Sequence, residues 1–183
     1  RQMCIRDRDR ENRFISAAGE FSRSGGTEIF LVHKPSFSKS LPTDLNGYRE
    51  AYRGTIKMAE IVRKKTELKV NVVLGPHPVV WDIQANDIGV KESSELHISA
   101  VGLALDMIEE GEAICLGEVG RPHYSVPEDR WTEANDLLLE IMRMASSSNS
   151  PVQLHVEENG NQTCRDIAKL CDRSGLSKRR TVR

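Results

Sequence analysis

The sequence predicts an α/β fold in which parallel strands alternate with helices. Short runs rich in β-branched and apolar residues are separated by longer segments with helical periodicity, an alternation typical of parallel βαβ units. Polar residues also gather directly after each β-rich run, and enzymes built on parallel sheets place their chemistry at those ends. Two architectures fit these observations, a doubly wound sheet and a (β/α) barrel.

Four β-rich runs are predicted as strands, and residues that form turns bound them. The first run follows Gly25-Gly26, the second stops at Gly75-Pro76 and the third stops at Gly117. The four predicted strands are residues 27–32, 70–74, 113–116 and 151–154. The first run is not followed by a Gly-x-Gly-x-x-Gly motif, which disfavours a classical dinucleotide-binding sheet.

Five segments are predicted as helices. In residues 46–66, apolar side chains such as Tyr48 and Tyr52 recur on one face of a helix. Glu128 and Asp129 stand near the start of a later segment, where carboxylates interact favourably with the helix dipole. The five predicted helices are residues 14–24, 46–66, 93–110, 127–145 and 161–174.

Composition and charge indicate an ordinary globular protein. Apolar residues make up 38% of the chain, and 26 basic residues balance 27 acidic ones for a net charge of −1. On electrostatic grounds this balance indicates neither a nucleic-acid nor a membrane partner. The four cysteines lack Cys-x-x-Cys or zinc-finger spacing, so we expect reduced thiols in a cytoplasmic protein. The sequence shows no apolar signal region and no stretch near the roughly 18 apolar residues of a membrane span.

The two ends differ from those of a complete (β/α) barrel, which has eight strands and typically about 250 residues. Residues 1–10 contain four arginines, and the string MCIRDR resembles translated sequencing-adapter sequence. We therefore expect residues 1–13 to be a non-native or disordered stretch and residues 14–183 to form a partial barrel domain. Residues 177–183 lie where the next strand should begin.

Glu118 and His155 are the strongest candidates for metal ligation. Glu118 follows an apolar run between glycines, so its carboxylate can reach a cation without crowding. His155 ends a predicted strand, and neutral imidazole is a common ligand of zinc and similar metals. The alternatives are a structural carboxylate paired with Arg121 and a core histidine bonded to a backbone carbonyl. Two ligands alone do not complete a catalytic site.

The loop after the third predicted strand holds three further candidates. Arg121 suits phosphate or carboxylate because its guanidinium is planar, and it could equally pair with Glu118. His123 and Tyr124 could orient a substrate, donate to a phosphate or simply line the loop. We take Arg121 and His123, with Glu118, as candidate catalytic residues and Tyr124 as a candidate substrate contact.

Other polar residues lie at the same ends of the predicted strands. Lys34 follows the first strand and is either a contact for an anionic substrate or a solvated charge. His77 lies between two prolines on a stiff loop, where it either contacts substrate or serves the turn. Glu157 is either a partner of His155 or a charge at a helix N-terminus. His97 lies inside a predicted helix, and we expect it to be a surface or packing residue.

Four segments resemble, in this order and spacing, the archaeal TatD-related branch of the amidohydrolase superfamily: GGTEIFLVHKP, VNVVLGPHP, AICLGEVGRPHY and PVQLHVE. The resemblance covers residues 14–183, and GEVGRPHY is its most specific part. It implies a TIM barrel that binds one or two divalent metal ions, Zn, Mn or Mg. Glu118 matches the family's Glu after the fourth strand, a bridging ligand where two metals bind, and His155 matches the His after the fifth.

By this resemblance the four predicted strands are the family's strands two to five. The family's His-x-His pair on the first strand is absent from this sequence, and its His after the sixth strand and Asp after the eighth have no counterpart before Arg183. The resemblance implies a metal-dependent hydrolase in which a metal-activated water attacks a phosphodiester, DNA included, or a related ester or amide. We expect the fragment by itself to be inactive.

Two other functions remain open at this point. One is a non-catalytic (β/α) binding or assembly module, whose open sheet edges would need a partner such as a second copy. The other is a different TIM-barrel enzyme with phosphate sites on later strands. For the hydrolase, the expected partner is a phosphate-containing or small-molecule substrate, and no membrane is involved.

Overall fold

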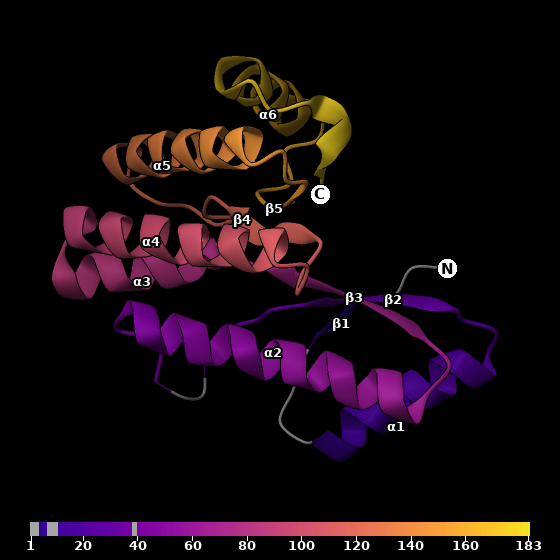
Figure 1. Ribbon diagram of the computed structural model, residues 1–183. Coiled ribbons are helices and arrows are strands. Elements are labelled where there is room, and N and C mark those ends of the chain that lie inside the picture. Colours follow the sequence, from indigo (N-terminus) through magenta and orange to yellow (C-terminus); the bar gives the residue numbers. More distant parts are fainter. Residues whose placement is uncertain (1–3, 7–10, 38–39) are drawn as a thin grey trace.

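The computed structural model describes residues 4–6, 11–37 and 40–183. Strands and helices alternate along this part of the chain (Figure 1). The strands are β1 (Cys4–Arg6), β2 (Glu28–Val32), β3 (Lys69–Leu74), β4 (Cys115–Gly120), β5 (Val152–His155) and β6 (Thr181–Val182). The helices are α1 (Glu11–Arg23), α2 (Leu45–Lys65), α3 (Pro78–Ile88), α4 (Val90–Glu109), α5 (Glu128–Ser147) and α6 (Asn161–Ser174), and the 3₁₀ turn η1 (Lys178–Arg180) precedes β6.

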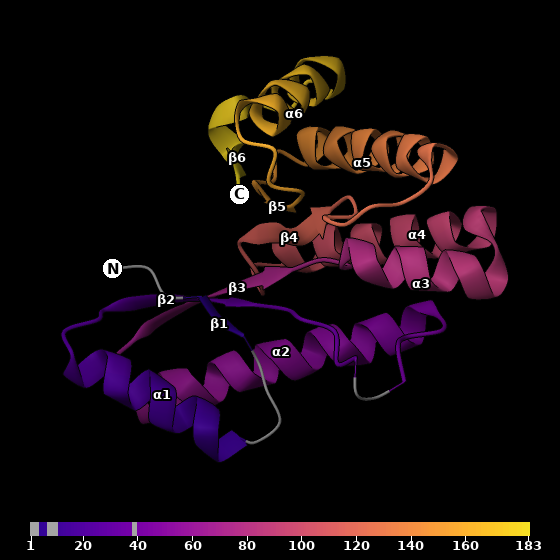
Figure 2. The same cartoon turned by 180° about the vertical axis from the view of Figure 1, so that it is seen from behind.

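The strands form one parallel sheet in the order of the chain, β1-β2-β3-β4-β5-β6. Each new strand therefore adds to the same growing edge, as in the wall of a (β/α) barrel. Figures 1 and 2 show the helices following one another along this sheet, from α1 at one end to α6 at the other. The predicted parallel α/β organisation is confirmed.

Apolar side chains cover both faces of the sheet. One face packs under the helices in the main core, to which Leu31, Val72 and Leu116 belong. On the other face lies a small cluster made of Phe30, Val32, Val73 and Cys115. Full burial of one such aliphatic side chain contributes about 1.5–3 kcal/mol. Burial on both faces explains why the strands are continuous apolar runs in the sequence.

The sequence pattern does not predict three of these elements. Strands β1 and β6 have three and two residues, too few to show a periodicity. Helix α3 lies in a segment without a predicted element, because it is buried on several sides and lacks a single apolar stripe. Its start has a clear local cause, since Pro78 occupies the first turn and His77 caps it. Gly89, with a φ of 92°, separates α3 from α4.

The first residues differ in part from the expectation. Strand β1 precedes the first helix, where the sequence predicts no strand, and α1 begins at Glu11 rather than at residue 14. Residues 1–3 and 7–10 lie outside the described residues, so a non-native stretch over residues 1–13 stays a prediction. Within the described part of the chain, no helix has the length and apolar character needed to cross a membrane.

Strand β4 continues to Gly120, beyond the predicted end at residue 116. Two glycines allow β4 to lie unusually close to β5. A Cβ atom at Gly120 would lie 1.9 Å from the His155 carbonyl oxygen, and one at Gly117 would lie 2.7 Å from the Cβ of Gln153. These glycines therefore serve a close approach of two strands rather than a turn, and Glu118 and His155 lie on these two strands.

Gly120→Ala should destabilise the fold, because the added methyl group meets the His155 backbone. We expect a loss of about 1–3 kcal/mol in the free energy of unfolding, as for an overpacked core, measured by urea denaturation. Gly54→Ala is the matched control, since its Cβ meets nothing within 4 Å in α2, and it should stabilise by about 0.5–1 kcal/mol. Similar effects of the two substitutions would contradict the close approach.

Candidate metal centre

Three side chains with ligand atoms meet at the carboxyl ends of β3, β4 and β5. Glu118 lies in β4, His155 ends β5, and His77 stands between β3 and α3. The Oε2 atom of Glu118 lies 3.7 Å from Nε2 of His77 and 3.7 Å from Nδ1 of His155. The ligand atoms of all three residues lie within 4.8 Å of one another, close enough to surround one cation.

The cluster is largely shielded from solvent. Glu118 is 8% exposed and His77 is 5% exposed, whereas the His155 side chain is 22% exposed. Burial, and after it the charges of neighbouring His155 and Lys34, lowers the pKa of His77 to about 3, so that its ring is neutral near pH 7. A buried carboxylate beside imidazole rings is a donor set that zinc and related divalent ions accept.

His77 differs from the other two members in its hydrogen bonding. The backbone N–H of Val79 donates to Nδ1 of His77 over 3.2 Å. A neutral imidazole that accepts at Nδ1 carries its proton on Nε2, which is the atom that faces Glu118. In this state His77 offers a hydrogen-bond donor, and it can ligate through Nε2 only if the bond from Val79 is given up. The donor set therefore fits a divalent ion through Glu118 and His155, with His77 beside it.

His123 lies against His155 at the outer side of the cluster. Its Nδ1 is 2.9 Å from Nε2 of His155, and the two rings meet edge to face at 4.7 Å. The contact occupies the ring nitrogen of His155 that points away from Glu118 and leaves Nδ1 on the side of the carboxylate. The predicted candidate His123 is thus placed at the cluster, as a hydrogen-bond partner of His155.

Arg121 lies in a different environment from the one predicted. It is 2% exposed, and its Nε donates to Oε2 of Glu157 over 2.8 Å while Nη2 donates to Oε1. Its Nη1 donates to Asn135 over 2.5 Å, and the Trp131 ring lies 4.5 Å from the guanidinium carbon. The predicted alternative of a pair with Glu118 is therefore wrong, and a guanidinium held in this way is poorly placed to clamp an anion.

Glu157 completes this buried pair. Burial opposes its ionisation, but the hydrogen bonds from Arg121 outweigh that effect and hold the pKa of Glu157 below its ordinary value. Thr163 in α6 also donates to its carboxylate over 2.9 Å. Neither predicted role for Glu157, as a partner of His155 or as a charge at a helix end, describes this arrangement. It joins the loop after β4 to the start of α6.

A cavity of about 600 Å³ opens beside His77, between the end of β2 and the start of α2. Two of the predicted substrate contacts, Lys34 and His77, line it together with Thr43. At its base His33 is buried, with its Nδ1 2.9 Å from the Thr55 hydroxyl, and burial lowers its pKa to about 4. The structure thus joins the cluster to a space with both a positive charge and hydrogen-bond donors.

Tyr124, the third predicted substrate contact, points elsewhere. Its hydroxyl donates to Oδ2 of Asp82 in α3 over 2.6 Å, and it is not among the described residues that line the cavity beside His77. Asp82 also binds Arg130 of α5. Sequence reasoning misses both Asp82 and Arg130, because nothing in their spacing indicates that α3 and α5 meet. His77, in contrast, can be found from the sequence, because it is a polar residue shortly after a predicted strand.

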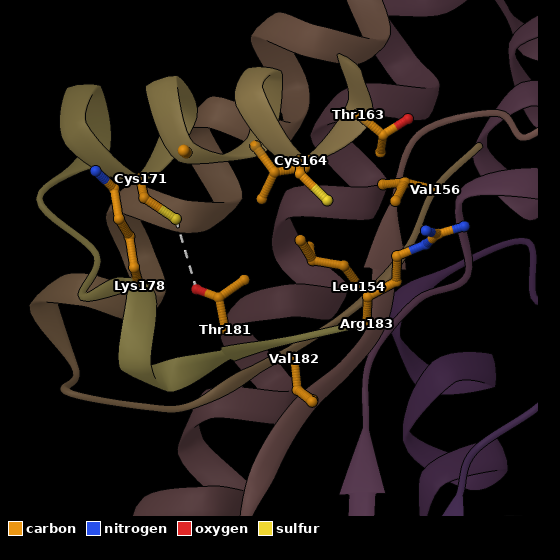
Figure 3. A pocket seen from close by; sticks show the side chains of 11 residues that line it. Leu154, Val156, Thr163, Cys164, Cys171, Lys178, Thr181, Val182 and Arg183 are labelled. Atoms are coloured by element: carbon orange, nitrogen blue, oxygen red, sulfur yellow. Dashed lines mark hydrogen bonds between the residues drawn. The ribbon is translucent and has the colours of Figure 1, made fainter. Parts of the chain in front are cut away.

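A second pocket, of about 220 Å³, lies between α6 and the β5–β6 edge of the sheet (Figure 3). Apolar side chains such as Leu154 and Ile167 line it, together with Cys164 and Cys171. The members of the cluster do not line this pocket, so it is separate from the candidate centre. Cys115, Cys164 and Cys171 are free cysteines in the structure.

His97 is fully buried in α4, and both of its ring nitrogens lack a hydrogen-bond partner among the described residues. Burial lowers its pKa to about 3. Of the two expected roles, surface or packing, the structure shows packing. An unpaired polar ring in the core is costly once it becomes charged.

The fold and the cluster together define a parallel (β/α) domain with a group of side chains that could hold a metal ion at the carboxyl ends of its strands. The crystal structure of an uncharacterized amidohydrolase from Saccharomyces cerevisiae is similar in fold, with a TM-score of 0.56 and 14% sequence identity. The similar part covers 87% of this chain and 44% of the yeast chain. This likeness in fold confirms the predicted fold class, an α/β domain that forms part of a (β/α) barrel.

The family profile of the TatD related DNases matches residues 6–182. This chain therefore belongs to the TatD-related DNase family, as its sequence motifs predict. An uncharacterized protein of Methanocaldococcus jannaschii is 26% identical over 167 residues, which cover 91% of this chain and 57% of that protein. The chain thus spans little more than half the length of the curated relative that it matches.

His97→Leu should reduce the loss of stability in acid. The pKa of His97 is about 3 in the folded chain, so below pH ~6.5 the unfolded chain binds a proton that the folded chain does not, and stability falls as the pH falls. For this group alone the loss reaches about 2 kcal/mol at pH ~5. Urea unfolding near pH 7.5 and pH 5 measures it, and equal losses in the native chain and His97→Leu would refute the assignment.

Glu157→Gln should destabilise the chain strongly, because it leaves the Arg121 guanidinium buried without its counter-charge. We expect a loss of about 3–5 kcal/mol in the free energy of unfolding. The double replacement Arg121→Met with Glu157→Leu should recover much of this loss, since it buries no charge. Chemical denaturation of the three chains tests both statements, and a double variant as unstable as the single one would contradict the buried pair.

Proposed function

We propose that this chain contributes part of the active site of a metal-dependent hydrolase that cleaves phosphodiesters. The observation that carries the proposal is the pairing of Glu118 and His155 on neighbouring strands, with Oε2 of Glu118 3.7 Å from Nδ1 of His155. Carboxylate and imidazole together are common ligands of catalytic zinc and manganese. The description of the family as TatD related DNases supports the hydrolytic class.

Each residue of the cluster has a separate task in this proposal. Glu118 and His155 would hold the ion, and the chemistry that a bound divalent ion supplies is a water of lowered pKa, a source of hydroxide near neutral pH. His123 orients the His155 ring through their 2.9 Å contact. His77 presents its Nε2–H on the side of Glu118 and also lines the cavity, so it would donate to a substrate oxygen held between the two. Lys34 adds positive charge along the same cavity.

A phosphodiester suits this site better than a neutral ester or amide, because Lys34 and the donor on His77 both favour a negatively charged group. Support for DNA in particular comes from the family alone. The net charge of −1 supplies no basic field for tracking a duplex. We therefore propose that the substrate is recognised at a single phosphate in the cavity, rather than along a charged groove.

The two ligands Glu118 and His155 are fewer than a catalytic centre needs. The chain covers 57% of its relative from Methanocaldococcus jannaschii. We propose that the other ligands of the whole protein come from the remaining part of such a barrel. The chain by itself should then bind divalent ions weakly and hydrolyse little.

Substitutions in the cluster test these roles through metal affinity. Titration calorimetry of the chain with Zn²⁺ and Mn²⁺ should show at least about a 10-fold loss of affinity for Glu118→Gln and for His155→Ala. His77→Ala should leave the affinity within about threefold of native, because Nδ1 of His77 is engaged with Val79 and the ring acts as a donor.

Activity supplies the second measurement. In the full-length protein, all three substitutions should slow the hydrolysis of bis(p-nitrophenyl) phosphate and of a DNA oligonucleotide, His77→Ala by its effect on the substrate. Native metal affinity in both Glu118→Gln and His155→Ala would overturn the proposed centre. A native full-length protein that binds Mn²⁺ but cleaves neither substrate would overturn the phosphodiester assignment and leave the centre in place.

A further inference from the structure

A polar network outside the cluster connects α3, α5 and the loop after β4, with Asp82 buried and Tyr124 39% exposed. We call Asp82, Tyr124 and Arg130 the Asp82 network. Oδ2 of Asp82 accepts a hydrogen bond from the Tyr124 hydroxyl over 2.6 Å, and Oδ1 accepts one from Arg130 Nη1 over 2.8 Å. The side chains of Asp82 and Arg130 are only 13% and 16% exposed, so this ion pair is shielded from water.

Arg130 is itself held in place on several sides. Its Nη1 also lies 3.3 Å from the backbone oxygen of Asp82, and its Nη2 donates to Asn86 over 3.2 Å. The guanidinium carbon lies 5.5 Å from the centre of the Trp81 ring. Asp82, Asn86 and Trp81 of α3 thus hold Arg130 in place. Arg130 in turn fixes the carboxylate of Asp82. The acceptor that Tyr124 meets therefore has a defined position.

Tyr124 links Asp82 to the candidate centre, because it contacts both Asp82 and His123. It follows His123 in the loop between β4 and α5, and the two rings meet edge to face at 5.2 Å. Burial, and after it the bond to Asp82, raises the pKa of Tyr124 well above its ordinary value, so the hydroxyl stays a donor. His123 itself is exposed, and among the described residues its ring contacts Tyr124 and His155. The bond from Tyr124 to Asp82 thus anchors the loop next to His123.

We propose that Asp82 is a positioning residue: with Arg130 it fixes Tyr124, and through Tyr124 it holds His123 against Nε2 of His155. The effect on the centre is geometric. With Nε2 of His155 engaged by His123, the ring is turned so that Nδ1 faces Glu118, the orientation that the proposed ligand role requires. The inference rests on the proposed function for its consequence, but its geometry can be tested without a metal.

The arrangement also couples the two sides of the centre. Helix α3 starts directly after His77 and carries Asp82 in its second turn, so one rigid helix contacts Glu118 through His77 and the loop of His123 through Asp82. A shift of the loop away from α3 would separate His123 from His155 while leaving His77 in place. The Asp82 network therefore controls whether His123, after β4, stays in contact with His155 at the end of β5.

The first experiment observes the imidazole rings of the metal-free chain by two-bond ¹H–¹⁵N correlation spectroscopy. The chain has five histidines, so the spectrum is simple to assign. In the native chain we expect the His123 and His155 rings to share one slowly exchanging ring proton. Tyr124→Phe removes the anchoring hydroxyl and should abolish this signal. Asp82→Asn keeps an acceptor for Tyr124 and should retain it in part.

The second experiment measures affinity for Zn²⁺ alone. Tyr124→Phe and Asp82→Leu should each lower the affinity by about 3- to 10-fold, less than the loss of a ligand. Because both act through one contact, the double variant should bind no more weakly than the weaker single variant. Glu112→Gln is the matched control: it breaks the ion pair with Arg53 away from the centre, and affinity and ring signals should stay native.

The outcomes separate the two proposals. Ring signals and Zn²⁺ affinity that stay native in Tyr124→Phe and Asp82→Leu, with both chains folded, would overturn the positioning role and leave the metal centre standing. A native chain that binds no Zn²⁺ would overturn the ligand assignment, and the ring-proton comparison would still decide whether Asp82 positions His123. Loss of the signal in Glu112→Gln as well would show a general effect of stability and would also overturn the positioning role.

Discussion

The close approach of β4 and β5 is the constraint on which the candidate centre depends. Gly120 pairs with His155 across the two strands, and its missing side chain lets the backbones come together. The spacing of the two backbones therefore sets how far Glu118 lies from His155, and the side-chain rotamers only adjust that distance. Because the backbone already holds the two proposed ligands near each other, binding a cation would cost little further conformational entropy.

Behind this pair, two buried ion pairs hold the segments that frame the centre. Arg121 and Glu157 join the start of the loop after β4 to α6, and Asp82 and Arg130 join α3 to α5. Both pairs bury charge that is costly alone and tolerable together, so each specifies one arrangement of its helices. Arg121 pairs with Glu157 and Arg130 pairs with Asp82. Arg121 therefore does not form an ion pair with the nearby Glu118.

The sequence was enough to predict the alternation, the four central strands and the placement of Glu118 and His155 at the strand ends, since each rests on a local pattern. Apolar runs mark the strands, and a Glu or His at a strand end marks a site. It was not enough for α3, whose apolar residues face several neighbours, or for the end of β4, where glycine signals a turn in most sequences. The partners of Arg121 and Tyr124 come from distant segments, so only the packing of helices on the sheet reveals them.

The small cluster on the face of the sheet away from the helices has a use as a built-in reporter. Burial raises the pKa of the Cys115 thiol to about 12, and the side chain sits among Phe30, Val32 and Val73. A thiol reagent can reach the reactive thiolate only when the sheet opens there, while exposed Cys164 is accessible in the folded chain. The rate at which Cys115 is labelled therefore measures how often the strands that carry the ligands come apart.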